Sequence, residues 1–202
     1  MMNALRKPIE VSAKSKVTPP HDPGGKSKPR WPADSNISAH FSPCKRYRYT
    51  LTEIWDSQLS PIMWLLMNPS VASVEHADPT LIRTGRYARL WGYGGQLVGN
   101  VHAYRTTDKH KLLDVDDPEG PENVNALVHM AKQAGRVILA YGQPPKVLRP
   151  RSAEVVQLLR ETGATLHHLR LSKDGSPSHP LYLPATLGPT PPLPKTSVLA
   201  AG

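Results

Sequence analysis

The sequence predicts one α/β domain built as three layers, α/β/α, around a mostly parallel central sheet. Short apolar segments alternate with stretches of helical periodicity, which is the pattern of strands joined by crossover helices. Most of these segments lack alternation of polar and apolar residues, as expected of strands covered on both faces. The length of 202 residues and the apolar fraction of 39% suit one ordinary core.

The folded part is expected to start near Ser38, after an arm over residues 1–37. Its first strand is predicted to be antiparallel or at an edge, because apolar and polar residues alternate along it. The alternating residues are Tyr47, Tyr49 and Leu51 on one side and Arg46, Arg48 and Thr50 on the other. Residues 62–67 form the next strand, whose continuous apolar run predicts burial on both faces.

The first helix is predicted from Asp78 to about Trp91. Asp78 suits the N-cap position, and Pro79 suits the first helical position because it lacks an N–H that would stay unpaired there. Three glycines, at positions 92, 94 and 95, end this helix. An apolar strand follows over residues 96–104.

The second half of the chain repeats the alternation. A helix from about Pro121 to Gly135 carries its apolar residues on one face, and a second helix covers residues 151–162. Buried strands are predicted at residues 136–142 and 165–171. The domain is expected to end at residue 185, and the proline-rich residues 186–202 are expected to form a tail.

The charge and the composition of the chain limit the classes of function that are possible. Residues 1–30 carry seven Lys or Arg against two acidic residues, out of a net charge of +9 for the chain. Such a basic arm is expected to be disordered, and it could bind a phosphate backbone or serve only as a solubilising tail. Cys44 is the only cysteine, which excludes an internal disulfide, and no cofactor or metal is expected. Without a membrane-spanning run or signal peptide, the chain is expected to be cytoplasmic and free of membranes.

Polar residues follow the predicted strands, where ligands bind in open parallel sheets. Asn68, Pro69 and Ser70 end one strand, and Asn100, Tyr104 and Arg105 lie in or after the next. Lys173 and His179 follow the last strand. Amides, a histidine and cations suit a planar, hydrogen-bonding ligand near phosphate, so DNA or a nucleotide is the expected partner.

Each of these residues has a structural alternative. Asn68 could simply cap the turn after its strand, and Asn100 could cross-link the core, because a buried amide needs partners. His179 could be an ordinary hydrogen-bonded surface residue. Arg105, Lys109 and Lys111 could contact phosphate or belong to a solvated face. Tyr104 could stack on a base or pack in the core.

The chain resembles the bacterial and phage family called domain of unknown function 1643, over about residues 40–184. The resemblance is carried by the segments "FSPCKRYRY", "LLMNPSVAS", "ADPT", "RLWGYGG", "GNVHAYRTTD", "DPEGPENVNAL" and "SPSHPLYLP". The family usually places an acidic residue soon after Asn-Pro-Ser, where this chain has Val71-Ala72-Ser73.

The order of Asn-Pro, strand Asn, aromatic-Gly and late His-Pro is also similar to the uracil-DNA glycosylase superfamily. This resemblance implies the fold of that superfamily and hydrolysis of an N-glycosidic bond without a metal. Asn68 would hold the attacking water, Asn100 would read the base, and His179 would stabilise the departing base. Two alternatives stay open: a binder of modified DNA or nucleotide that lost catalysis, and a different nucleotide-processing enzyme on the same fold.

Overall fold

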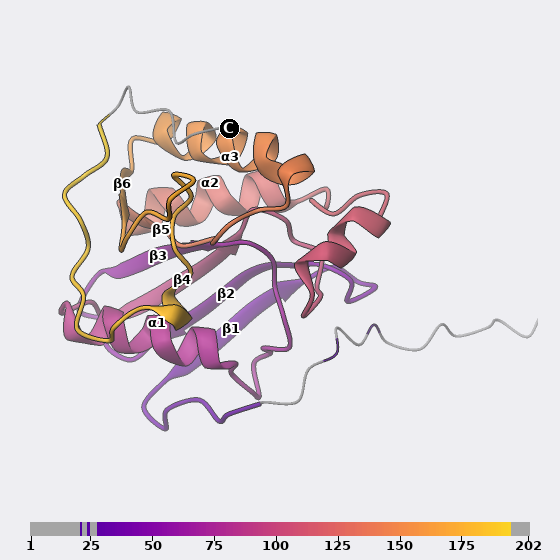
Figure 1. The fold of residues 1–202 in the computed structure, drawn as a ribbon. Helices are drawn as coiled ribbons and strands as arrows, with labels where there is room; N and C mark the ends of the chain where they lie inside the picture. Colours follow the sequence, from indigo (N-terminus) through magenta and orange to yellow (C-terminus); the bar gives the residue numbers. More distant parts are fainter. Residues whose placement is uncertain (1–20, 22–23, 25–27, 195–202) are drawn as a thin grey trace, which may run out of the picture.

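A computed structural model describes residues 21, 24 and 28–194, which form a six-stranded sheet with helices on both faces (Figure 1). The strands are β1 (Asn36–Phe41), β2 (Arg48–Ile54), β3 (Pro61–Leu66), β4 (Gly95–Asn100), β5 (Arg136–Leu139) and β6 (Thr165–His168). The α-helices are α1 (Pro79–Leu90), α2 (Asn123–Ala134) and α3 (Arg149–Glu161). Short 3-10 turns cover η1 (Lys109–Asp114), η2 (Lys146–Leu148) and η3 (Pro180–Tyr182).

The sheet is mixed, so the expectation of a mostly parallel sheet is wrong. Its order is β1-β2-β4-β3-β5-β6; β4, β3, β5 and β6 run parallel, whereas β1 and β2 add antiparallel strands at one side. The antiparallel β2 was predicted, but β1 was not. β1 alternates between exposed and half-buried residues and has few strand-forming apolar side chains, so its pattern gave little signal.

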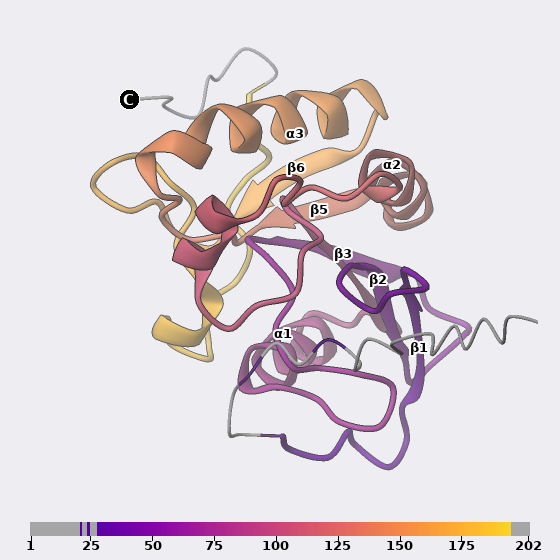
Figure 2. The same cartoon turned by 90° about the vertical axis from the view of Figure 1, so that its right-hand side faces the viewer.

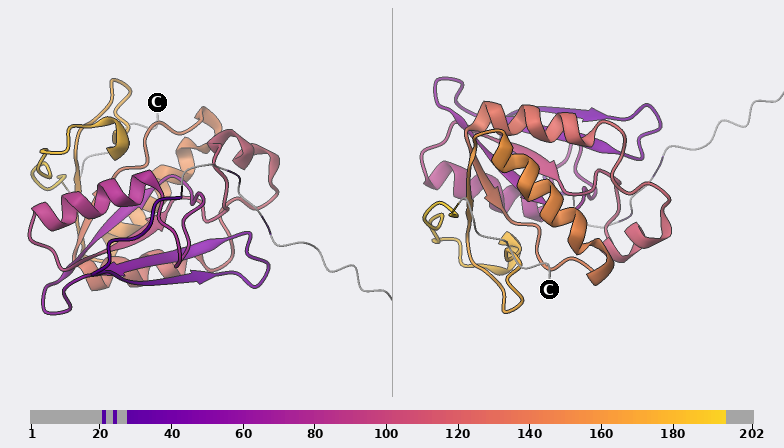
Figure 3. Two further views of the ribbon diagram at one scale, coloured as in Figure 1. Left: turned by 90° about the horizontal axis from the view of Figure 1, so that it is seen from below. Right: turned by 90° about the horizontal axis from the view of Figure 1, so that it is seen from above.

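Helices cover both faces of the sheet (Figure 2). Each face packs against its helices in an apolar core. Leu81, Tyr87 and Ala88 of α1 pack against Trp64 and Leu66 of β3 on one face. On the other face, the apolar residues of α2 and α3 pack against the alternate residues of β3 and β5. The two views of Figure 3 show α1 from one side and α2 with α3 from the other. β3 lies between both cores, which explains its unbroken apolar run.

A β-bulge at the start of β2 reverses the predicted orientation of Arg48. Phe41 pairs with Arg48 while His40 pairs with Thr50, so Tyr49 is the extra residue. Consequently Tyr49 packs near Gly120, while the guanidinium of Arg48 donates to the carbonyl oxygen of Ala72. Both side chains are buried, although the alternation had placed Arg48 on the polar side of the strand.

Segments outside the expected domain boundaries contact the domain. The carbonyl of Pro29 accepts a hydrogen bond from Ala77, and the indole of Trp31 donates to the carbonyl of Ser73. At the other end, Thr190 and Leu193 donate backbone hydrogen bonds to β6. The expected arm and tail are thus partly packed on the domain, while residues 1–20 and 195–202 lie outside the described part. No helix in the described part is long and apolar enough to cross a membrane.

Candidate functional site

A large cavity among the described residues lies at the carboxyl ends of the parallel strands. Its volume is about 770 Å³, which is within the range of small-molecule sites. Residues after β3, β4, β5 and β6 line it, together with the start of α1 and the η3 turn. Asn68, Thr106, Gly142 and Arg170 come from these four strand ends. The cavity thus lies at the edge of the sheet where the strand endings predict a ligand site.

Asn68 lines the cavity in a fixed orientation. Its amide nitrogen donates to the carbonyl oxygens of Thr106 (2.6 Å) and Pro69 (3.2 Å). Because two carbonyl oxygens accept from the nitrogen, the amide oxygen points away from them, and it has no hydrogen-bond partner among the described residues. Asn68 thus offers an anchored acceptor, as well as bracing the turn as the structural alternative predicted.

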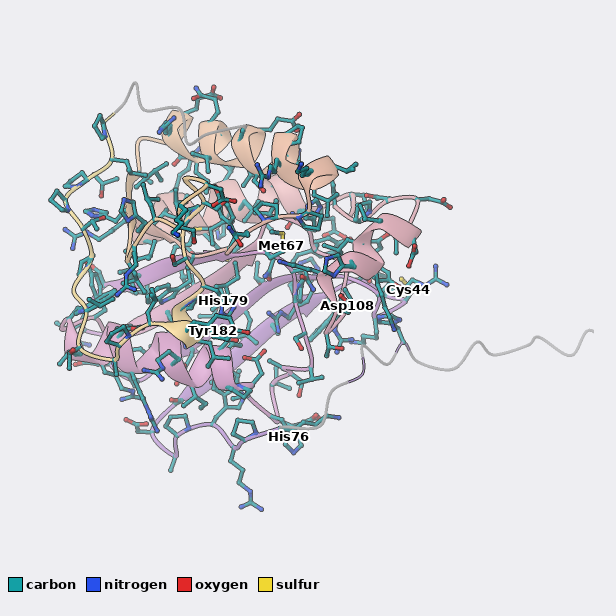
Figure 4. The ribbon with its side chains drawn as sticks, viewed as in Figure 1. Cys44, Met67, His76, Asp108, His179 and Tyr182 are labelled. Carbon is teal, nitrogen blue, oxygen red and sulfur yellow. The ribbon has the colours of Figure 1, made fainter. Side chains whose placement is uncertain are left out.

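His179 lines the same cavity from the start of η3. Its Nδ1 accepts the backbone N–H of Leu181 at 3.4 Å, which leaves the proton of the neutral ring on Nε2. Burial lowers the pKa of His179, so the neutral form is favoured at neutral pH. In Figure 4, His179 and Tyr182 lie next to each other to the left of Met67, and Asp108 lies to its right.

Of the residues predicted after the first buried strand, Ser70 lines the cavity and Pro69 does not. Pro69 is buried, and its carbonyl accepts the N–H of Thr106. Asn100 is the last residue of β4, next to the cavity-lining Leu66 in the sheet register. It is 1% exposed and does not line the cavity, and both polar atoms of its side chain lack partners among the described residues.

The remaining predicted site residues lie away from the cavity. Tyr104 is half-buried against Tyr47, with ring centroids 5.9 Å apart. Arg105 donates to the carbonyl of Lys45 at 2.8 Å and lies over the ring of Phe41. Lys173 is exposed in the loop after β6. Its sequence neighbour Ser172 lines the cavity, but Lys173 does not. The structure therefore brings together Asn68, Ser70 and His179 only.

The cavity also contains charged residues that the sequence analysis did not assign to it. These are Arg48, Asp78, Asp108 and Arg170. Lys109, which was expected to contact phosphate or to lie on a solvated face, lines the cavity as well. The oxygen Oδ1 of Asp78 accepts the N–H of Leu81 at 2.9 Å as the predicted helix cap, and the same side chain borders the cavity. The "ADPT" segment predicted Asp78 as a helix cap but not as a cavity residue. Arg48 was not predicted because the β-bulge changes the direction of its side chain.

The arrangement can recognise a polar, planar ligand with a negative charge. The cavity is lined by an amide acceptor, a histidine donor, hydroxyl groups and cations. The apolar side chains of Leu66, Met67 and Leu183 line it as well. Tyr141 also lines it, and burial raises the pKa of its hydroxyl to about 12, so this group stays protonated. Among the described residues, no group of three or more His, Cys, Asp or Glu side chains is placed to hold a metal ion.

Comparisons with known proteins give a family and no activity. The model of one protein family, described as a protein of unknown function (DUF1643), matches residues 48–181. This match runs from the start of β2 into η3, and it includes all the residues that line the cavity except Tyr182 and Leu183. No curated protein and no solved structure gives a significant match.

Proposed function

Since the chain belongs to the DUF1643 family of unknown function, we propose from its cavity that it binds a nucleobase as part of a nucleotide or DNA, and hydrolyses the N-glycosidic bond. The observation that supports this function is that Asn68 and His179, separated by most of the domain in sequence, line one cavity. The proposed fold relationship to the uracil-DNA glycosylase superfamily is supported by the helices on both faces and by the site at the carboxyl ends of the parallel strands.

Asn68 and His179 have complementary roles in this reaction. The free amide oxygen of Asn68 accepts a hydrogen bond from water and holds it against the anomeric carbon. The Nε2–H of His179 donates to the departing base, on which negative charge develops as the C–N bond breaks. As the C–N bond breaks, the water oxygen bonds to the anomeric carbon and then releases one proton to solvent. The departing base takes up one proton from solvent, so the products are the free base and a sugar hydroxyl.

Tyr182 supplies a surface on which a base can stack. Its side chain is 82% exposed at the cavity rim, although tyrosine usually buries its ring. The ring lies 5.6 Å from that of His179. Stacking on such a ring contributes about 1 to 3 kcal/mol per base. If DNA is the substrate, the base must leave the duplex stack to enter this cavity.

The decisive experiment measures base release. The protein is incubated with DNA that carries uracil, hypoxanthine or 5-hydroxymethyl bases, and with the corresponding nucleotides, and free base is quantified. Asn68→Ala should abolish release with little loss of binding, and His179→Ala should slow the chemical step roughly 10²- to 10³-fold, as for the loss of one charge-stabilising donor. Exposed His129, on α2, provides the control His129→Ala.

A non-catalytic binder of nucleotide or modified DNA is the second candidate. It is favoured by the residues that follow Asn68, because Val71 and Ala72 are buried apolar side chains where an acid could activate water. The nearest acid along the chain that lines the cavity, Asp78, already accepts a hydrogen bond from Leu81. Base-dependent binding without release on any of these substrates would establish this second function in place of the first.

A further inference from the structure

Arg48 is a buried cation that faces the cavity without an ion pair. The residue is 2% exposed, and its Nη1 donates to the carbonyl of Ala72 at 3.1 Å. Among the described residues, its Nε has no hydrogen-bond partner and no carboxylate lies within 4.0 Å of the guanidinium, although the charge of Asp78 acts on it from farther away. A buried charge of this kind is costly unless an opposite charge or several hydrogen bonds compensate for it.

The other lining cations share this property. Lys109 donates to the carbonyl of Gln143 at 2.7 Å, and Arg170 is exposed; neither forms an ion pair with a described carboxylate. The two lining acids also bond to backbone groups, because Asp78 accepts from Leu81 and Asp108 accepts from His110, both at 2.9 Å. Three cations and two acids line the cavity, so its charged side chains leave a net positive charge for an anionic ligand.

The depth of Arg48 restricts which anion can reach it. Lys109 is half-buried and Arg170 is exposed, whereas Arg48 is the most enclosed of the three cations. A phosphodiester inside a DNA strand continues in both directions and has to stay near the rim. A terminal phosphate has only one covalent connection, so it can enter an enclosed site.

We infer that Arg48 binds the terminal phosphate of a mononucleotide, or of an oligonucleotide end, and that this group distinguishes the ligand from a base inside a DNA strand. The inference rests on the proposed function, because it takes the nucleotide base to occupy the same cavity. Burial lowers the pKa of Arg48 to about 10, so the guanidinium keeps its charge at neutral pH. Thr80 and Leu81, in the first turn of α1, line the same cavity, and the carboxylate of Asp78 caps this helix end.

Calorimetric titration of the wild-type protein tests the inference. The probes are the common nucleoside 5′-monophosphates, the matching nucleosides, inorganic phosphate, and a single-stranded oligonucleotide with and without a 5′-terminal phosphate. The monophosphate should bind about 10- to 100-fold more tightly than its nucleoside, as expected for charge-assisted hydrogen bonds. The 5′-phosphate should improve oligonucleotide binding in the same way.

Variants then assign the preference to Arg48. Arg48→Gln should remove the preference for the monophosphate over its nucleoside, and Arg48→Lys should restore part of this preference. Arg46→Gln changes a neighbouring exposed arginine and serves as the matched control. Thermal melting identifies any variant that is unfolded, and the comparison of ligands on the wild-type protein needs no variant.

The outcomes separate the two proposals. Equal binding of nucleoside and monophosphate by the wild-type protein overturns the phosphate site and leaves the base-binding function standing. Retention of the phosphate preference in Arg48→Gln also overturns the assignment. Failure of every base-containing probe, with inorganic phosphate still bound through Arg48, instead refutes the proposed base-binding function.

Discussion

The side-chain nitrogen of Asn68 lies 2.6 Å from the carbonyl oxygen of Thr106, and this hydrogen bond joins the turn after β3 to the loop after β4. The two strands are parallel neighbours in the sheet, so their carboxyl ends lie at the same edge. The bond fixes the amide plane, and so it positions the oxygen proposed to hold water. Structural and catalytic roles for Asn68 are therefore compatible.

Asn68→Asp should destabilise the protein more than Asn68→Ala does. The alanine variant loses two hydrogen bonds, at about 0.5 to 1.5 kcal/mol each. The aspartate variant would in addition place a carboxylate against two carbonyl oxygens, which should cost roughly 1 to 3 kcal/mol more. Urea denaturation at pH 7 measures both changes. Asn125→Asp, at an exposed position on α2, is the control, and an Asn68→Asp variant as stable as this control would contradict the hydrogen-bond assignment.

The stability of the protein should fall as the pH drops from about 6.5 to 4, in part because of His102. Burial, and secondarily the charge of Arg151, lowers the pKa of His102 to about 4. The unfolded chain therefore binds a proton in this window that the folded chain does not, so unfolding is favoured at the lower pH. The full effect is on the order of 3 kcal/mol.

Denaturation curves at several pH values test this assignment. His102→Gln should flatten the dependence between pH 6.5 and 4, whereas His129→Gln, at an exposed position, should leave it unchanged. Burial also lowers the pKa values of His168 and His179, so part of the pH dependence of the unfolding free energy should remain in the variant. An unchanged slope in His102→Gln would show that His102 does not contribute.

Tyr182→Ala should weaken nucleotide binding by about 1 to 3 kcal/mol, because the base would lose its stacking surface. Tyr182→Phe keeps the ring and should bind like the wild type. Thermal stability should hardly change in either variant, since the side chain is 82% exposed. Calorimetry with a nucleoside monophosphate measures the effect, and equal affinity of the alanine and phenylalanine variants would remove Tyr182 from the site.

Gly99→Ala should destabilise the core by about 1 to 3 kcal/mol through overpacking. A Cβ at this position would lie 2.6 Å from a methyl carbon of Leu127 and 2.9 Å from the terminal carbon of Met130, both on α2. Gly188→Ala is the matched control, because nothing lies within 4 Å of its Cβ position. Chemical denaturation gives both values, and equal stability of the two variants would mean that α2 can shift without cost.

The sequence predicted the elements with strong periodicity and the edge of the sheet where the cavity lies. The three long helices and the buried strands have continuous apolar faces, and the Asp78-Pro79 start of α1 is confirmed by its capping hydrogen bond. Asn68 and His179 were grouped through the shared direction of parallel strands. The strand order, however, follows from long-range pairing, and no local pattern in the sequence specifies it.

Most differences arise where the backbone departs from regular geometry. One extra residue, Tyr49, reverses the orientation of Arg48, so strict alternation gives the wrong face. Tyr104 and Arg105 were expected at the ligand because they follow β4 along the chain. The chain turns beyond Asn100, and the carbonyls of the loop at Lys45 and Arg46 instead accept hydrogen bonds from Arg105.

The backbone contacts from Thr190 and Leu193 have a consequence for self-association. β6 is the last strand of the sheet, and an uncovered last strand can pair with a strand of another molecule. Here the carbonyls of Leu166 and His168 are already acceptors for the C-terminal segment, and prolines on both sides of Leu193 cannot donate to an added strand. The proline-rich segment thus protects the β6 side against aggregation, so a chain shortened at residue 186 should polymerise more readily through that side.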